Sequence, residues 1–156
     1  MRAYLLVGNC GSGKTWVMKR LIETLQLTIN AKVGLIRFKT NRINCVLGKY
    51  DGTTFEGSDK LSMAVAKDFQ LLQRVAEQKQ LTLIAEGDRF MNKRFIETFK
   101  PYIVKILDEG TRGRQHRGST QSERQLKSIS TRVKNIQEDV IVKNSTEALN
   151  KLLELI

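Results

Sequence analysis

The sequence has few of the residues that interrupt a chain or ligate metals. Its 156 residues include one proline, two cysteines and one histidine. A single proline, with 40% hydrophobic and 28% charged residues, argues against long disordered linkers. Cys10 and Cys45 are far apart and form no CxxC pair, and His116 alone cannot supply a metal cluster. We therefore expect neither a metal site nor a redox site at the thiols.

Long apolar runs are also missing. The N-terminal run at 3–7 is much shorter than the roughly 18 residues that a membrane span requires, and it is too short for a signal peptide. We therefore expect a cytoplasmic protein. A chain of 156 residues fits one folding unit, so we predict a single domain over residues 1–156.

Positive charge is in excess. The formal net charge is +11 and the isoelectric point is about 9.9. Between Arg89 and Lys134, twelve Lys or Arg stand against four Asp or Glu, so 12 − 4 = +8 of net charge lies in this segment. Such a segment attracts polyanions, but a basic surface can also be merely solvated, and small nucleotides need cations too. Charge alone leaves these interpretations open.

Apolar spacing predicts alternating strands and helices. The continuous run at 3–7 ends in glycine and is typical of a buried parallel strand, whereas residues 15–25 have helical spacing. Alternation of this kind implies right-handed crossovers and a mostly parallel central sheet in a three-layer α/β sandwich. The other predicted strands are 33–38, 81–85, 102–107 and 140–142, and a short extended piece is predicted at 44–50. The other predicted helices are 61–78, 91–99, 120–136 and 146–156.

The strongest motif lies between the first strand and the first helix. Gly8-x-x-x-x-Gly13-Lys14-Thr15 matches the phosphate-binding loop at every defined position. In such a loop, backbone N–H groups converge on phosphates, the lysine spans the β- and γ-phosphates of ATP, and the hydroxyl binds Mg²⁺. The glycine order does not fit GxGxxG, which disfavours a dinucleotide. We predict a P-loop kinase-like fold with Lys14 catalytic, in which ATP and Mg²⁺ are bound by Gly8, Asn9, Cys10, Gly11, Ser12, Gly13, Lys14 and Thr15.

Two carboxylates follow the strand predicted at 81–85. Glu86 stands where P-loop folds usually place an acidic residue that holds Mg²⁺ or its water, and Asp88 follows on the same edge. A carboxylate near the transferred group can accept the acceptor's proton, and Arg89 can hold a phosphate. Asp88 can alternatively cap the helix predicted at 91–99. We predict catalysis or metal binding for at least one of Glu86 and Asp88.

Arginines gather in the loop after the strand predicted at 102–107. Arg112, Arg114 and Arg117 lie in a segment without apolar periodicity, and Arg124 opens the next helix. Arginines that close over phosphates neutralise the charge of the transferred group and exclude water. We predict a lid at about 108–120, with Arg112 on ATP and with Arg114 and Arg117 catalytic. A solvated basic loop is the alternative.

Several segments together resemble the 5-hydroxymethyluracil DNA kinases, P-loop kinases with which phages modify their own DNA. Besides the P-loop, the similar segments are VLGKY at 46–50, GSDKLS at 57–62, IAEGDR at 84–89 and TRVKNI at 131–136. Glu56 and Ser58 depart from the resemblance, since glycine and threonine are expected there.

The resemblance implies an enzyme that transfers the γ-phosphate of ATP to the hydroxymethyl group of a modified base in DNA, in the host cytoplasm if a phage encodes it. Such an enzyme would unstack the base, and the basic segment would follow the DNA phosphates. Arg89, Lys93 and Arg94 are then expected to contact the substrate. Asp59 can hold the base or cap the following helix.

Two other functions stay open from the sequence. One is a kinase for a small acceptor, such as a nucleoside or nucleotide, and the other is a P-loop ATPase module that acts on DNA. A GTPase is disfavoured, because no NKxD-like segment is present.

Overall fold

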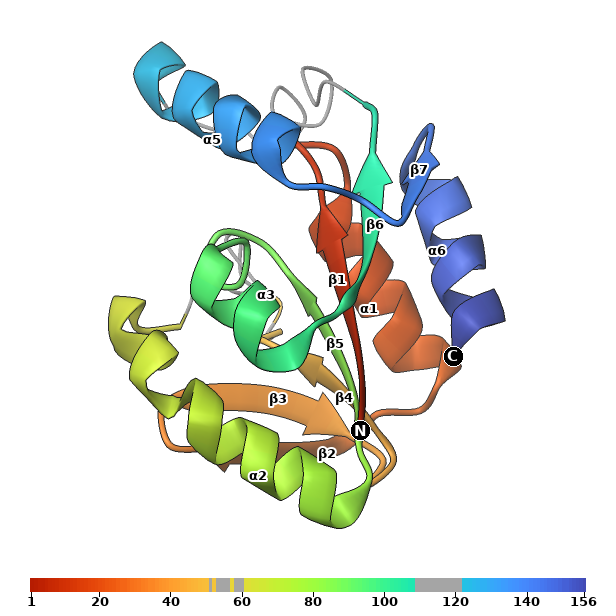
Figure 1. The fold of residues 1–156 in the computed structure, drawn as a ribbon. Helices are drawn as coiled ribbons and strands as arrows, with labels where there is room; N and C mark the ends of the chain where they lie inside the picture. Colours follow the sequence, from red (N-terminus) through yellow and green to blue (C-terminus); the bar gives the residue numbers. More distant parts are fainter. Residues whose placement is uncertain (51, 53–56, 58–60, 109–121) are drawn as a thin grey trace.

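A seven-stranded mixed sheet lies at the centre of the computed structural model, which describes residues 1–50, 52, 57, 61–108 and 122–156. The strand order is β2-β3-β4-β5-β1-β6-β7, and helices lie on both faces (Figure 1). The strands are β1 (Arg2–Val7), β2 (Ile29–Val33), β3 (Ile36–Thr40), β4 (Asn44–Leu47), β5 (Thr82–Glu86), β6 (Tyr102–Ile106) and β7 (Val140–Val142). The helices are α1 (Lys14–Thr24), the 3₁₀ helix η2 (Met63–Asp68), α2 (Phe69–Lys79), α3 (Lys93–Phe99), α5 (Glu123–Asn135) and α6 (Ser145–Leu155).

The parallel part of the sheet is centred on β1. This strand pairs in parallel with β5 on one side and β6 on the other, and β7 extends the sheet beyond β6. Helices cover both faces here, so β1 reads as a nearly continuous apolar run. The predicted α/β class with a mostly parallel sheet is confirmed, and the arrangement is compatible with a three-layer sandwich.

The single strand predicted at 33–38 is wrong. The chain instead forms an antiparallel hairpin of β2 and β3, in which Val33 pairs with Ile36 and Gly34 turns with a φ of 58°. A left-handed φ suits glycine, which has no Cβ to clash. The apolar residues on both sides of Gly34 resembled one strand because the turn is only two residues long. The Leu35 N–H donates to Asp68 Oδ2 at 2.8 Å, which anchors the turn beside α2.

Two apolar cores lie on opposite faces of the sheet. One packs α2, α3 and the end of α5 against the sheet, and the other packs α1 and α6 against it (Figure 1). In the first core, four phenylalanine rings stack edge-on or tilted around α2 and α3, with centroids 4.7–6.2 Å apart. These rings belong to Phe69, Phe90, Phe95 and Phe99.

Local capping sets where the helices begin. The helix predicted at 61–78 starts as the 3₁₀ helix η2, with the Ser62 hydroxyl accepting the Ala64 N–H. The helix predicted at 91–99 starts two residues later, because Asn92 Oδ1 accepts the Phe95 N–H at 2.8 Å. Asp88 therefore does not cap α3. The predictions at 140–142 and 146–156 are confirmed by β7 and, within one residue, by α6. Among the described residues, no helix is long and apolar enough to cross a membrane.

Candidate active site

The glycine-rich loop (residues 8–13) connects β1 to α1 at the carboxyl edge of the parallel strands. Gly11 and Gly13 have φ values of 84° and 95°, and the Ser12 N–H donates to the Asn9 carbonyl at 3.1 Å. A Cβ on Gly13 would lie 2.7 Å from the Cβ of Ser145, so α6 approaches the loop too closely for a side chain. The loop therefore needs glycine for conformation and for space.

Polar atoms of this loop are concentrated and incompletely paired. Lys14 Nζ donates to the Gly8 carbonyl at 2.8 Å and to the Asn9 carbonyl at 3.0 Å, so the ammonium lies over the loop. Within the described residues, Asn9 Oδ1 and Ser12 Oγ are buried without a hydrogen-bond partner. Unpaired buried polar atoms cost free energy and are uncommon. The first turn of α1 contains no acidic residue, so its positive end is not offset locally. The loop is suited to an anionic ligand.

Glu86 ends β5 beside this loop. Glu86 is the strand partner of Leu6 in β1, and it is 3% exposed. The Tyr50 hydroxyl donates to Glu86 Oε1 at 3.2 Å. A Cβ on Gly57 would meet the same oxygen, so the backbone of Gly57 packs directly against the Glu86 carboxylate. Glu86 is thus a buried carboxylate held at the carboxyl edge, one strand from the glycine-rich loop.

The donors at this edge suit Mg²⁺ in type. The predicted ligands, the Thr15 hydroxyl and the Glu86 carboxylate, are hard oxygen donors, which Mg²⁺ prefers. Within the described residues, no group of three His, Cys, Asp or Glu side chains could hold a metal. Mg²⁺ commonly binds one or two protein oxygens, with water and substrate phosphates completing its shell. The residues present fit that mode of binding.

Asp88 lies in an ion-pair cluster beyond Glu86. Its carboxylate pairs with Arg132 of α5 and, at 3.6 Å, with Arg89. The contact of Asp88 Oδ1 with Arg132 is an ion pair without hydrogen-bond geometry. Arg89 Nε also donates to the Leu61 carbonyl at 3.3 Å. The position of Asp88 therefore depends on α5, the helix that follows the predicted lid.

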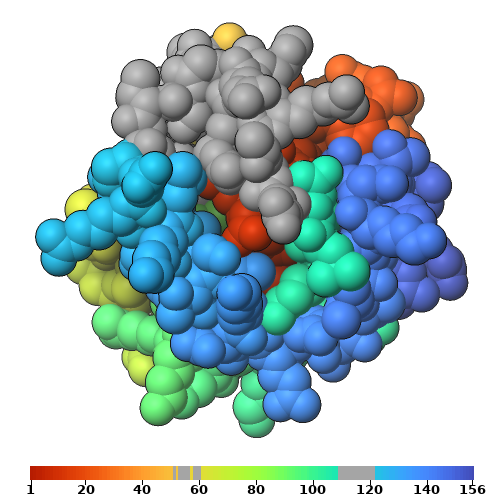
Figure 2. Space-filling view, turned by 90° about the horizontal axis from the view of Figure 1, so that it is seen from above, coloured from red at the N-terminus to blue at the C-terminus, as the bar shows by residue number. Residues whose placement is uncertain are grey.

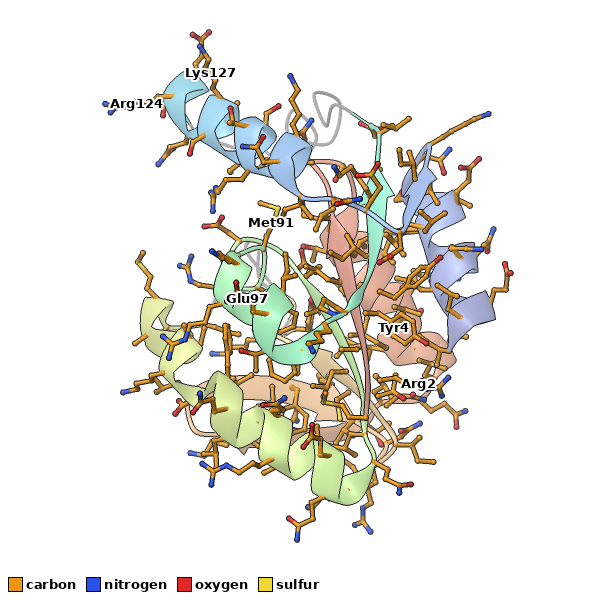
Figure 3. All side chains as sticks on the ribbon, in the orientation of Figure 1. Arg2, Tyr4, Met91, Glu97, Arg124 and Lys127 are labelled. Carbon is orange, nitrogen blue, oxygen red and sulfur yellow. The ribbon has the colours of Figure 1, made fainter. Side chains whose placement is uncertain are left out.

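The end of α5 is held against the sheet by apolar and polar contacts. Met91 lies between α3 and α5 and is 3% exposed (Figure 3). Lys105 of β6 donates to the Ile136 carbonyl at 2.6 Å and pairs with Glu138 at 2.9 Å. The hydrogen bond from Lys105 is the main reason that the pKa of Glu138 is lowered.

The beginning of α5 lies further from the sheet than its end. Arg124 and Lys127 lie at that beginning and point away from the body (Figure 3). Seen from above, part of the N-terminal segment lies between α5 and β6 (Figure 2). The helix therefore borders one side of the candidate site.

The structure brings together part of the predicted site. The glycine-rich loop, Lys14 and Glu86 share one edge, with Asp88 and Arg89 beside them. Lys93 and Arg94 are exposed on α3, where Lys93 pairs with Glu97 at 3.7 Å. The predicted residues Asp59, Arg112, Arg114 and Arg117 lie outside the described residues.

Three residues of the site were not predicted as such. Tyr50 orients Glu86, Arg132 holds Asp88, and Ser145 sets the space around Gly13. Tyr50 and Arg132 carried a usable signal, because both lie in segments that carry the family resemblance, VLGKY at 46–50 and TRVKNI at 131–136. Ser145 carried none, because it comes from a helix distant in sequence.

Neither protein-family models nor curated proteins give a match to this chain. The structure defines an α/β protein with a mostly parallel sheet and a glycine-rich loop before its first helix. That loop and the side chains around it form the candidate site.

Proposed function

We propose that this protein is a P-loop phosphotransferase that uses ATP and Mg²⁺. The observation that carries the proposal is the glycine-rich loop: its motif, its two left-handed glycines, the Lys14 ammonium over it and the buried unpaired oxygens of Asn9 and Ser12. Together these features supply what a polyphosphate requires from a loop and a helix N-terminus. Mg²⁺ would supply charge neutralisation for the bound phosphates.

The acceptor that we propose is the hydroxymethyl group of 5-hydroxymethyluracil in DNA. The resemblance of five segments and the net charge of +11 support this choice over a nucleoside. Transfer forms a bond between the acceptor oxygen and the γ-phosphorus and breaks the bond from that phosphorus to the β–γ bridging oxygen. ADP leaves, and the hydroxyl proton passes to a carboxylate.

The two carboxylates have different roles in this proposal. Glu86 serves the metal, because it is buried beside the strand that leads into the loop. Asp88 accepts the proton, and Arg132 and Arg89 hold its carboxylate in place. Arg112, Arg114 and Arg117 are proposed to neutralise the transferred group.

A panel of acceptors tests the function. The protein is incubated with γ-labelled ATP and Mg²⁺ together with hydroxymethyluracil DNA, unmodified DNA, nucleosides or nucleotides. We expect label in the modified DNA alone. Label in a small acceptor would instead establish the nucleoside or nucleotide kinase. Release of labelled phosphate without any labelled acceptor would establish an ATPase.

A charge reversal tests the predicted DNA contact of α3. Lys93→Glu with Arg94→Glu should weaken DNA binding and flatten its dependence on salt, while leaving ATP affinity nearly unchanged, because both side chains are exposed and lie outside the glycine-rich loop. Intact DNA phosphorylation by the double variant would remove α3 from the acceptor site.

A further inference from the structure

A second basic surface lies on the opposite side of the sheet from α3. The side chains of cross-strand partners point to the same face of a sheet. Lys39 is the partner of Val46, which packs in the core between the sheet and helices α1 and α6, so Lys39 lies on that face. Lys32 and Arg37 are cross-strand partners on that face, two residues from Lys39 along β3. With Lys49 they form what we call the basic face: Lys32, Arg37, Lys39 and Lys49.

The basic face borders a cavity of about 690 Å³. Lys32 and Arg37 are exposed, and Lys39 and Lys49 are half-buried. Within the described residues, Lys32, Arg37 and Lys39 form no ion pair. The residues that line the cavity include the four cations and no carboxylate; they are Asn30, Ala31, Lys32, Arg37, Phe38, Lys39, Gly48, Lys49 and Tyr50.

The arrangement of charges on this hairpin opposes its stability. Lys32 and Arg37 are direct cross-strand partners, and like charges in that position destabilise a sheet. Residues 1–50 contain nine Lys or Arg and one acidic residue, Glu23, so 9 − 1 = +8 of net charge lies in them. A lysine on an edge strand also discourages pairing between sheet edges, but a glutamate would do the same. Protection of the sheet edge therefore does not explain why the charged residues of this hairpin are positive.

The basic face leads to the candidate active site. The Arg37 carbonyl accepts the Gly48 N–H at 2.8 Å, which places Arg37 at the carboxyl end of β4. Tyr50 both lines the cavity and donates to Glu86. Two strand spacings, roughly 10 Å, separate the backbones of β3 and β5. Lys32, Arg37, Tyr50 and Glu86 thus lie along one edge of the sheet, and Lys39 lies two residues from Arg37 along β3.

We propose that the basic face binds the sugar-phosphate backbone of the DNA acceptor and directs it toward Glu86. This inference rests on the proposed function for its choice of polyanion. Repeated phosphates would meet the row of cations, while a base turned out of the stack extends along the edge. DNA would then contact the sheet edge from the hairpin side as well as from α3.

Charge reversal on β2 and β3 tests the inference, with binding of a fluorescein-labelled DNA duplex measured by anisotropy without ATP between 50 and 200 mM salt. Lys32→Glu with Arg37→Glu should weaken binding at least about tenfold at low salt. The log–log salt slope should fall in magnitude by about 1.8, or about 0.9 for each lost phosphate contact. Arg74→Glu with Lys79→Glu is the matched control, because both side chains are exposed on α2, on the opposite side of the sheet.

The single variant Lys32→Glu separates binding from folding. It replaces a like-charge pair with an opposite-charge pair across β2 and β3, so the melting temperature should stay level or rise while DNA affinity falls. The inference is overturned if the hairpin variants bind DNA as tightly as the α2 control. That failure differs from failure of the proposed function, which the acceptor panel reports through phosphate transfer by the unmodified protein.

Discussion

The two halves of the sheet differ in what covers them. β5, β1 and β6 pair in parallel and bury most of their residues between two helical layers. The β2–β3 hairpin is antiparallel and packs Ile36 and Phe38 under α2, while its other side presents Arg37 and Lys39. The buried parallel strands can hold the glycine-rich loop in one conformation. The β2–β3 hairpin, which is covered on one face only, can present charged side chains to solvent.

This difference suggests that the two halves of the sheet have different roles. Packing on both faces fixes the ends of the parallel strands, and these strands hold the glycine-rich loop and Glu86 in place. The hairpin contributes a surface whose side chains face solvent. The proposed ATP chemistry and the proposed acceptor binding should therefore respond to different substitutions.

The largest expected effect is that of Lys14→Ala in the parallel half. Loss of the ammonium should lower turnover on the order of a thousandfold, because in the proposed mechanism Lys14 stabilises the developing charge of the transferred group. The affinity for DNA should not change, since Lys14 lies outside the basic face. Steady-state rates and anisotropy measure the two properties. Near-normal phosphotransfer by the folded variant would contradict the kinase proposal.

The carboxylates should separate metal use from proton transfer. Glu86→Gln should raise the Mg²⁺ concentration needed for ATP use, whereas Asp88→Asn should spare ATP affinity and lower turnover about a hundredfold. Titration of Mg²⁺ and measurement of ATP affinity distinguish the two. Small and equal effects of both substitutions would place the chemistry elsewhere, with Asp59 as the next candidate.

Gly34→Ala should damage the hairpin and spare the nucleotide site. A Cβ at Gly34 would meet the Asp68 carboxylate, in a residue with a φ of 58°. Backbone strain and loss of the Leu35–Asp68 bond should together lower the free energy of unfolding by about 2–3 kcal/mol. Gly52→Ala is the control, because its φ is 86° and a Cβ there meets no described atom within 4 Å. Denaturation should show a larger loss for Gly34→Ala, and equal losses would refute the anchoring role of Asp68.

The smallest expected effect concerns the attachment of α5 in acid. The lowered pKa of Glu138 means that its carboxylate stabilises the fold above the ordinary glutamate pKa. That contribution disappears as the pH falls through the lowered value. The melting temperature of Glu138→Gln should therefore lie slightly below that of the unmodified protein at neutral pH, and the difference should shrink in acid. A constant difference at all pH values would show that the charge of Glu138 is not involved.

Local signals predicted the parallel half, and distant contacts explain what sequence reasoning missed. The run before Gly8 and the motif after it are contiguous, so the first strand, the loop and the first helix followed from a few residues. The hairpin was missed because the conformation of Gly34 is supported by Asp68, far along the chain. The candidate site shows the same contrast. Glu86 was predicted because it follows a strand in the sequence, whereas the pairing of Arg132 with Asp88 depends on how α5 packs against the rest of the protein.

The central place of β1 has a consequence for how the chain folds. Leu5 pairs with Ala85 and Ile103, which lie 85 − 5 = 80 and 103 − 5 = 98 residues later. Because β1 precedes both of its partner strands in the chain, its apolar run stays exposed until β5 and β6 are available to pair with it. Long-range parallel pairing of this kind slows folding and invites aggregation. We expect refolding yields to fall with protein concentration and to improve when a chaperone shields the N-terminal segment.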